Sequence, residues 1–130
     1  MRFMMIVKAN QDSEAGVPPP PELMAAIGKL GQEAALAGRM VASGGLLPSS
    51  AGVRVRVARG KLNVTDGPFS EARELVGGFA IFELPSKAEA VEAGRQFMQL
   101  HADILGPAWE GELEIRPMMD AMPQDGPGVR

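Results

Sequence analysis

The sequence predicts a single domain of the α+β class, and three observations lead to this prediction. The chain has 130 residues, of which 45% are hydrophobic, which is enough for one packed core and too little for two. Short segments with strand-like apolar patterns flank two longer segments whose apolar residues repeat every three or four positions, as in helices. Their order along the chain is β-α-β, a β-hairpin, then β-α-β.

The first strand and the first helix have clear patterns. Residues 3–7 are apolar on both alternating faces, which indicates a central strand covered on both sides. Residues 11–21 are polar and end in four prolines, as in a loop that leads into a helix. A helix is then expected over residues 22–37, because its apolar residues form one stripe. That stripe consists of Leu23, Ile27, Leu30, Ala34 and Ala37.

The helix also has a second, small-residue face around Gly28 and Gly31, which favours close approach of a neighbour. Gly38 is expected to cap its C-terminus. A strand is predicted over residues 40–47, followed by a loop over 48–52.

The middle of the chain predicts a β-hairpin. Val53, Val55 and Val57 alternate with arginines, which predicts a strand with one dry and one solvated face. Residues 59–61 form the turn and residues 62–65 the returning strand. Asp66-Gly67-Pro68 then ends the pairing.

The last third repeats the β-α-β pattern. A strand is expected over residues 79–84, and Ser86 with Glu89 forms a capping box that starts the second helix. Residues 104–109 form an apolar connection, and residues 112–116 a last strand. The domain is therefore expected over residues 1–119, with a mobile tail over 120–130.

This order of elements is that of the ferredoxin-like split βαβ fold with an inserted β-hairpin. Two helices cover one face of such a sheet, and the apolar first strand requires cover on the other face as well. A second copy that packs face to face would supply it, so the sequence predicts a homodimer.

Composition excludes several classes of function. The net charge is −3, whereas phosphate-backbone binding requires clustered basic residues, so we expect no nucleic-acid partner. The chain has no cysteine, which excludes thiol catalysis and cysteine-bound zinc. The apolar run near the N-terminus is too short for a signal peptide or a membrane span, so a cytoplasmic protein without a membrane partner is expected.

Several separated motifs resemble those of one family. Residues 66–69 read Asp-Gly-Pro-Phe, and Glu71, Glu74 and the pair Gly77-Gly78 follow at short spacing. Residues 43–48 and 114–117 are similar to the glycine-rich strand end and the closing Glu-x-Arg-Pro of the same group. The chain therefore resembles the DGPF branch of the YCII-related family over almost its whole length.

The resemblance implies a dimeric α/β barrel, and it brings an association with extracytoplasmic-function sigma factors as an expectation. It implies no established reaction. Some relatives carry a histidine early on the first helix, and this chain has none there. Arg73 and Ala72 also depart from the lysine and threonine that the family often has.

Asp66 is the first candidate for a functional residue. A carboxylate at the end of a strand can act as a general base or bind a ligand, although Asp66-Gly67-Pro68 also makes an ordinary turn. The ligand-binding set expected from the motif and its surroundings, in a groove between sheet and helices, is Asp66, Gly67, Pro68, Phe69, Glu71, Arg73, Glu74 and Arg116. Arg116 would orient a substrate carboxylate.

His101 is a second catalytic candidate because it is the only histidine. The default interpretation of its place near the end of an apolar helix face is a histidine stabilised by the helix dipole. One histidine with scattered carboxylates does not make a metal site, so we predict no metal and no cofactor.

Three classes of function remain open on the sequence. The first is a dimeric small-molecule-binding protein linked to a sigma-factor system. The second is a cofactor-free lyase, isomerase or oxygenase with Asp66 as general base. The third is an accessory subunit that binds another protein.

Overall fold

The computed structural model describes residues 1–71 and 74–119. It contains a four-stranded antiparallel sheet in the order β2-β5-β1-β6 and a separate two-stranded β3-β4 hairpin. The strands are β1 (Arg2–Lys8), β2 (Met40–Gly45), β3 (Val53–Ala58), β4 (Lys61–Asp66), β5 (Val76–Glu83) and β6 (Leu113–Pro117). The helices are α1 (Gln11–Glu14), α2 (Pro21–Leu36), η1 (Ser49–Ala51, a 3-10 turn) and α3 (Lys87–Leu105). The sheet order confirms a ferredoxin-like α+β fold.

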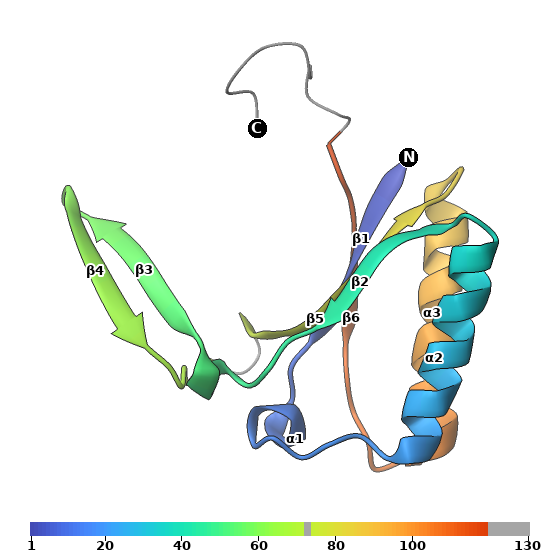
Figure 1. Ribbon diagram of the computed structural model, residues 1–130, viewed down its shortest axis with the longest axis horizontal. Helices are drawn as coiled ribbons and strands as arrows, with labels where there is room; N and C mark the ends of the chain where they lie inside the picture. The colour runs from blue at the N-terminus through green and yellow to red at the C-terminus, as the bar shows by residue number, and fades with distance from the viewer. Residues whose placement is uncertain (72–73, 120–130) are drawn as a thin grey trace.

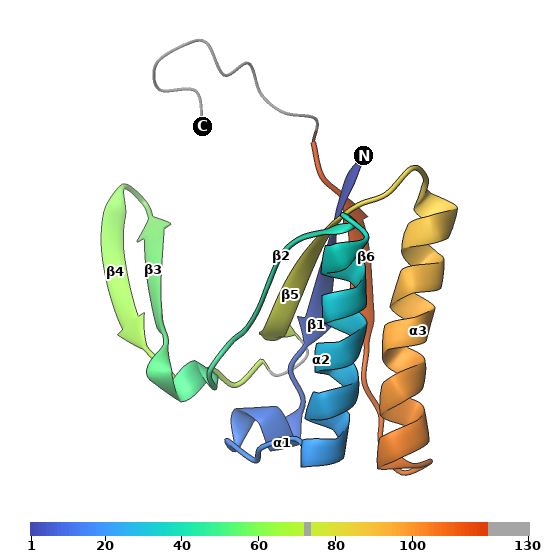
Figure 2. The same cartoon turned by 45° about the vertical axis from the view of Figure 1, so that its right-hand side comes forward.

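Two long helices lie side by side on one face of the sheet, and the hairpin projects from the other side (Figures 1 and 2). β1 is central between β5 and β6, as its apolar sequence predicts. Phe3 and Met5 on β1 point toward the helices and join Leu84 and Ala90 in the core. The space between sheet and helices is therefore filled by apolar side chains, so the expected groove does not lie there.

The first predicted loop contains a short helix. Asn10 accepts a hydrogen bond from the backbone N–H of Ser13, and the Ser13 hydroxyl accepts one from the Asn10 N–H. This reciprocal cap stabilises one turn of helix, α1, within a segment that its prolines suggest is loop. α2 begins one residue earlier than predicted, with Pro21 in its first turn.

The small-residue face of α2 is not used as predicted. A Cβ added to Gly28 would meet no atom within 4 Å, and one added to Gly31 would meet the Met40 side chain at an ordinary contact distance of 3.6 Å. No backbone approaches this face closely at either glycine. Gly38 follows the C-cap residue Ala37 and has a φ of 73°, a left-handed conformation that glycine adopts without strain.

The predicted strands and the second helix are present with shifted ends. β2 ends at Gly45, two residues before the predicted end, and Asp66 is the last residue of β4 rather than a residue of the turn. Gly77 and Gly78 lie inside β5. Ser86 caps α3 by accepting from the Glu89 N–H, and the helix continues to Leu105, through part of the predicted connection.

The hairpin differs most from its prediction. Its valines share one face as expected, but that face is exposed in the single chain. The predicted tail, residues 120–130, lies outside the described residues.

Candidate functional site

The Asp-Gly-Pro-Phe motif packs against the turn η1 at the base of the hairpin. The Gly67 N–H donates to the Gly52 carbonyl at 2.9 Å. A Cβ on Gly67 would overlap the carbonyl oxygen of Ser49. Glycine is therefore required at position 67 by close backbone approach.

Ser49 joins three segments of the chain. Its backbone N–H and its hydroxyl donate to the two carboxylate oxygens of Glu14, at 2.8 and 2.5 Å. Its Oγ also accepts from the Phe69 N–H at 3.0 Å. We call Glu14, Ser49, Gly52, Gly67 and Phe69 the hairpin base. The Ser49 hydroxyl is thus engaged as both donor and acceptor, and it holds the hairpin base together.

Arg54 connects the hairpin base to the next predicted site residue. Its guanidinium lies 3.9 Å from the centre of the Phe69 ring, and its Nη1 is 3.2 Å from Glu71 Oε2. The Glu71 backbone N–H, and next the Arg54 guanidinium, hold the pKa of Glu71 below its ordinary value. The ion pair is therefore complete at neutral pH and is lost as the pH falls through that lowered pKa. The pair is exposed, so its effect on stability is small.

The other predicted site residues are dispersed. Asp66 is exposed at the end of β4, opposite Val53. Glu74 is exposed, and its N–H donates to the Glu71 carbonyl. Arg73 lies outside the described residues. The motif thus brings Gly67 and Phe69 into the hairpin base, and Arg54 links Glu71 to it.

Arg116 belongs to a second region, on the face of the sheet away from the helices. Leu113 and Ile115 pack beside Gly94 of α3, so the alternating residues Glu114 and Arg116 point to the opposite face. Arg116 Nε lies 3.6 Å from Glu114 Oε2, and Lys8 Nζ lies 3.2 Å from Glu114 Oε1.

Apolar side chains continue this face across the central strands. The strand register places Met4 opposite Ile81 and Ile6 opposite Phe79, all four half-buried and on the side away from the core. We call Met4, Ile6, Phe79 and Ile81, with Lys8, Glu114 and Arg116, the open face. The open face thus joins an apolar surface to a chain of ion pairs. Lys8, with 21% of its side chain exposed, is the most buried of the three charged residues in that chain.

His101 has the surroundings of a core residue. It is buried, its Nδ1 donates to the Phe97 carbonyl at 2.9 Å, and its ring stacks on Trp109 with centroids 5.2 Å apart. These contacts account for the histidine by packing, and the helix-dipole explanation is not needed.

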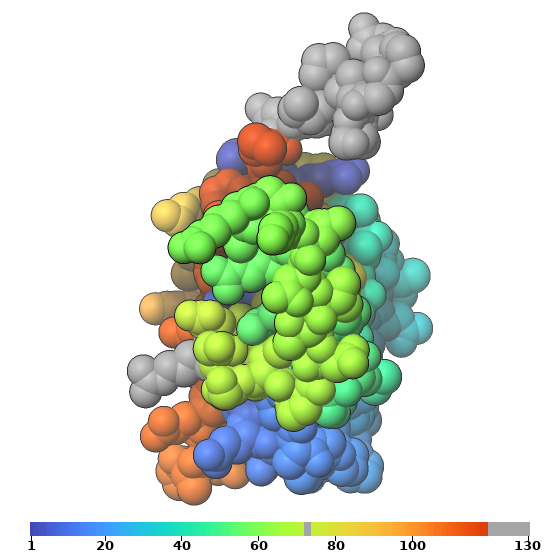
Figure 3. All heavy atoms as spheres, turned by 90° about the vertical axis from the view of Figure 1, so that its left-hand side faces the viewer, coloured from blue at the N-terminus to red at the C-terminus, as the bar shows by residue number. Residues whose placement is uncertain are grey.

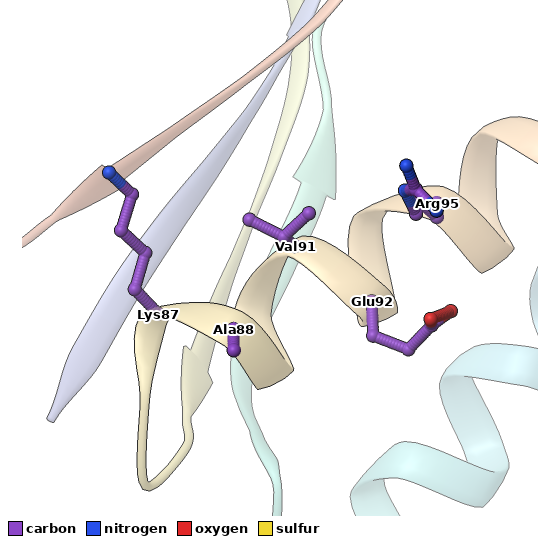
Figure 4. A pocket seen from close by; sticks show the side chains of 5 residues that line it. All are labelled: Lys87, Ala88, Val91, Glu92 and Arg95. Carbon is purple, nitrogen blue, oxygen red and sulfur yellow. The ribbon is translucent and has the colours of Figure 1, made fainter.

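The surface of α3 offers no comparable grouping of side chains for a ligand. A shallow depression on the outside of α3 is lined by Lys87, Ala88, Val91, Glu92 and Arg95, whose side chains do not point to a common centre (Figure 4). Among residues 1–71 and 74–119, no three acidic or histidine side chains come together as a metal-binding group requires. In the same residues, no helix is both long and apolar enough to cross a bilayer.

Comparison with known proteins identifies the family. The YCII-related domain matches residues 1–104 of this chain. The chain belongs to the YCII-related family. It is also 29% identical to an uncharacterised protein of Rhizobium meliloti, strain 1021, over 82 residues, which are 63% of this chain and 61% of that protein. The match thus spans less than two thirds of the relative's length. The comparisons thus show a family and do not bring a reaction with it.

Sequence reasoning missed Glu14, Ser49 and Lys8. The spacing of Asn10 and Ser13 is a capping signal that could have located α1 and thereby Glu14. Lys8 continues the alternation of Met4 and Ile6 and could have been assigned to their face. Nothing local marks Ser49, because its partners lie 35 and 20 residues away.

The carboxylate of Glu14 is expected to stabilise the hairpin base. Glu14→Gln replaces one acceptor oxygen by an NH₂ group that faces the Ser49 donors, and should cost about 1–2 kcal/mol of unfolding free energy. Urea denaturation measures this loss. Glu33→Gln, an exposed change on α2, is the control and should stay within about 0.5 kcal/mol of the unmodified protein. Equal effects of the two variants would contradict the role of Glu14.

Proposed function

We propose that this YCII-related protein is a homodimer that binds a small molecule on the open face of its sheet. The observation that carries the proposal is the open face itself, where Met4, Ile6, Phe79 and Ile81 form an apolar surface that no helix of the described residues covers. A second copy packed on this face would enclose it, and the two sheets would form the dimeric α/β barrel expected from the resemblance.

The chemistry of the open face favours an amphipathic organic acid. Small-molecule sites are mostly apolar, with a few polar groups that fix orientation. Lys8 is already neutralised by Glu114 at 3.2 Å. Arg116 makes a longer contact of 3.6 Å and is 69% exposed, so its guanidinium can receive a carboxylate through two parallel hydrogen bonds.

The proposal includes the DGPF branch and, with it, the link to an extracytoplasmic-function sigma-factor system. Its support is the Asp66–Phe69 motif and the spacing of Glu71, Glu74 and Gly77-Gly78 behind it. Within this proposal, Asp66 and the motif residues border the site from the hairpin, while Arg116 binds the ligand.

The binding role of Arg116 is tested by thermal unfolding with a panel of small aliphatic and aromatic carboxylates. Ligands that bind the folded state raise the melting temperature by mass action. Arg116→Ala should weaken the binding of each active acid about tenfold, as loss of a charged hydrogen-bonded contact requires. Arg95→Ala, on the outside of α3, is the matched control and should bind as the unmodified protein does.

Native mass spectrometry of the freshly purified protein completes this test. A dimer that carries an additional small mass is the expected spectrum. A protein that binds no acid in the panel and carries no additional mass would contradict the binding function.

A further inference from the structure

Among residues 1–71 and 74–119, nothing packs on the apolar face of the β3-β4 hairpin. The strand register puts its valines and Leu62 on one side, together with Asp66 opposite Val53 at the last pair of β4, and its arginines and other polar side chains on the other side. The apolar set is Val53, Val55, Val57, Leu62 and Val64, which are 54–73% exposed. An isolated two-stranded hairpin is marginally stable in water and needs a further strand or a packed face. This hairpin therefore requires a surface to cover it.

The position of the hairpin limits what that surface can be. Figures 1 and 2 show it standing apart from the four-stranded sheet, on the side away from α2 and α3. Seen from that side, it lies at the front of the molecule (Figure 3). The hairpin base holds its lower end through Ser49 and Phe69, so the apolar face extends from a fixed attachment.

A second copy of the chain offers a fitting surface. The open face of the sheet is also apolar and uncovered by helices, and a pair of six-residue strands reaches about 20 Å, nearly the length of β1. In a twofold dimer, each hairpin can lie on the partner's open face while its own open face receives the partner's hairpin.

The distribution of net charge along the chain also favours a second copy as the partner of the hairpin. Residues 53–66 have four basic side chains and one carboxylate, a net charge of +3 in a chain whose net charge is −3, so the rest of the chain carries −6. These opposite net charges attract the hairpin of one copy to the body of another at long range. The arginines of β3 lie on the face opposite to the valines, so they stay in solvent when the apolar face is covered.

We infer that the β3-β4 hairpin is an intersubunit arm whose apolar face covers the open face of the partner. The binding site is then composite, with a floor of Ile6, Phe79 and Ile81 from one protomer and a cover from the arm of its partner. This inference rests on the proposed dimer and specifies which element closes the site.

Adjacent residues on β4 provide a matched pair of variants. Val64 and Asn63 are both exposed and point to opposite faces of the hairpin. Val64→Glu and Asn63→Glu add the same charge. Any difference between their dimer dissociation constants therefore depends on which face of the hairpin carries the new glutamate. By analytical ultracentrifugation, Val64→Glu should raise the dimer dissociation constant at least tenfold and Asn63→Glu less than threefold.

Cross-linking tests the contact between the hairpin and the partner's open face directly. Because the chain has no cysteine, the introduced thiols are the only ones that can react. An affinity-tagged Val64→Cys protein is mixed with an untagged Ile81→Cys protein and treated with a short bis-maleimide. The mixed covalent dimer should form with at least five times the yield obtained from Asn63→Cys with Ile81→Cys.

Equal yields of the mixed covalent dimer from the two mixtures would overturn the inference that the hairpin covers the partner's open face. A double Val64→Cys and Ile81→Cys chain that links within itself and migrates as a monomer would also overturn it, since the hairpin would then cover its own sheet. If the protein is a dimer but Val64→Glu leaves its dissociation constant unchanged, the arm is wrong while the proposed dimer stands. A protein that is monomeric at every concentration contradicts both.

Discussion

Replacement of Gly67 by alanine is expected to lower the free energy of unfolding by about 2–3 kcal/mol, the cost of forcing extra atoms into a packed site. The added Cβ would overlap the carbonyl oxygen of Ser49. That oxygen belongs to the backbone, and Ser49 is held by Glu14 and Phe69. It cannot move aside without breaking the contacts that fix the hairpin base.

Gly45→Ala is the control for this prediction. A Cβ at Gly45 would meet no atom within 4 Å, so the change should alter stability by about 0.5 kcal/mol or less. Urea denaturation of both variants measures the difference. If Gly67→Ala unfolds at the same urea concentration as Gly45→Ala, the motif does not depend on close packing against η1.

A charge at the centre of the open face is expected to dissociate the proposed dimer. Ile81 lies opposite Met4 on β1 and Ala42 on β2, so a glutamate there would be buried without a partner if a second copy covers the face. Symmetry places the change twice in the interface. The dimer dissociation constant should therefore rise at least a hundredfold, which is about 2.7 kcal/mol, within the cost of burying unpaired charge.

Size-exclusion chromatography with light scattering measures the mass of Ile81→Glu across a range of concentrations. Gln32→Glu on the exposed side of α2 adds the same charge away from the open face and should remain dimeric. An Ile81→Glu protein that keeps the dimer mass at low concentration would show that the open face is not the interface.

The two predictions concern the two regions that the fold creates. The hairpin base explains why glycine and an aromatic residue occupy positions 67 and 69: one permits close backbone contact and the other stacks under Arg54. β1 is apolar on both sides, although helices of the described residues cover only one of them. The proposed dimer would cover the other side, which is the open face. The Asp-Gly-Pro-Phe motif therefore acts first as a structural connection, and the role of Asp66 as a base stays a prediction.

Local sequence patterns were sufficient for the order of the strands and of the two long helices and for the core, whereas α1 was predicted as loop. Alternation on β1 and the repeat of three and four on α2 depend on neighbours in the chain, so the class, the central strand and the buried residues Phe3, Met5 and Leu23 follow from them. The Ser86 cap of α3 is likewise local.

Only the tertiary structure decided which residues share a site. The sequence grouped Asp66, Phe69 and Arg116, but strand alternation directs Arg116 to Lys8 and Glu114, whereas Phe69 meets Ser49 and Arg54. It also decided that the apolar face of the hairpin is exposed in a single chain. The physical reason is that alternation shows which side chains share a face, while the surface that covers the face is supplied by residues distant in the chain or by another copy.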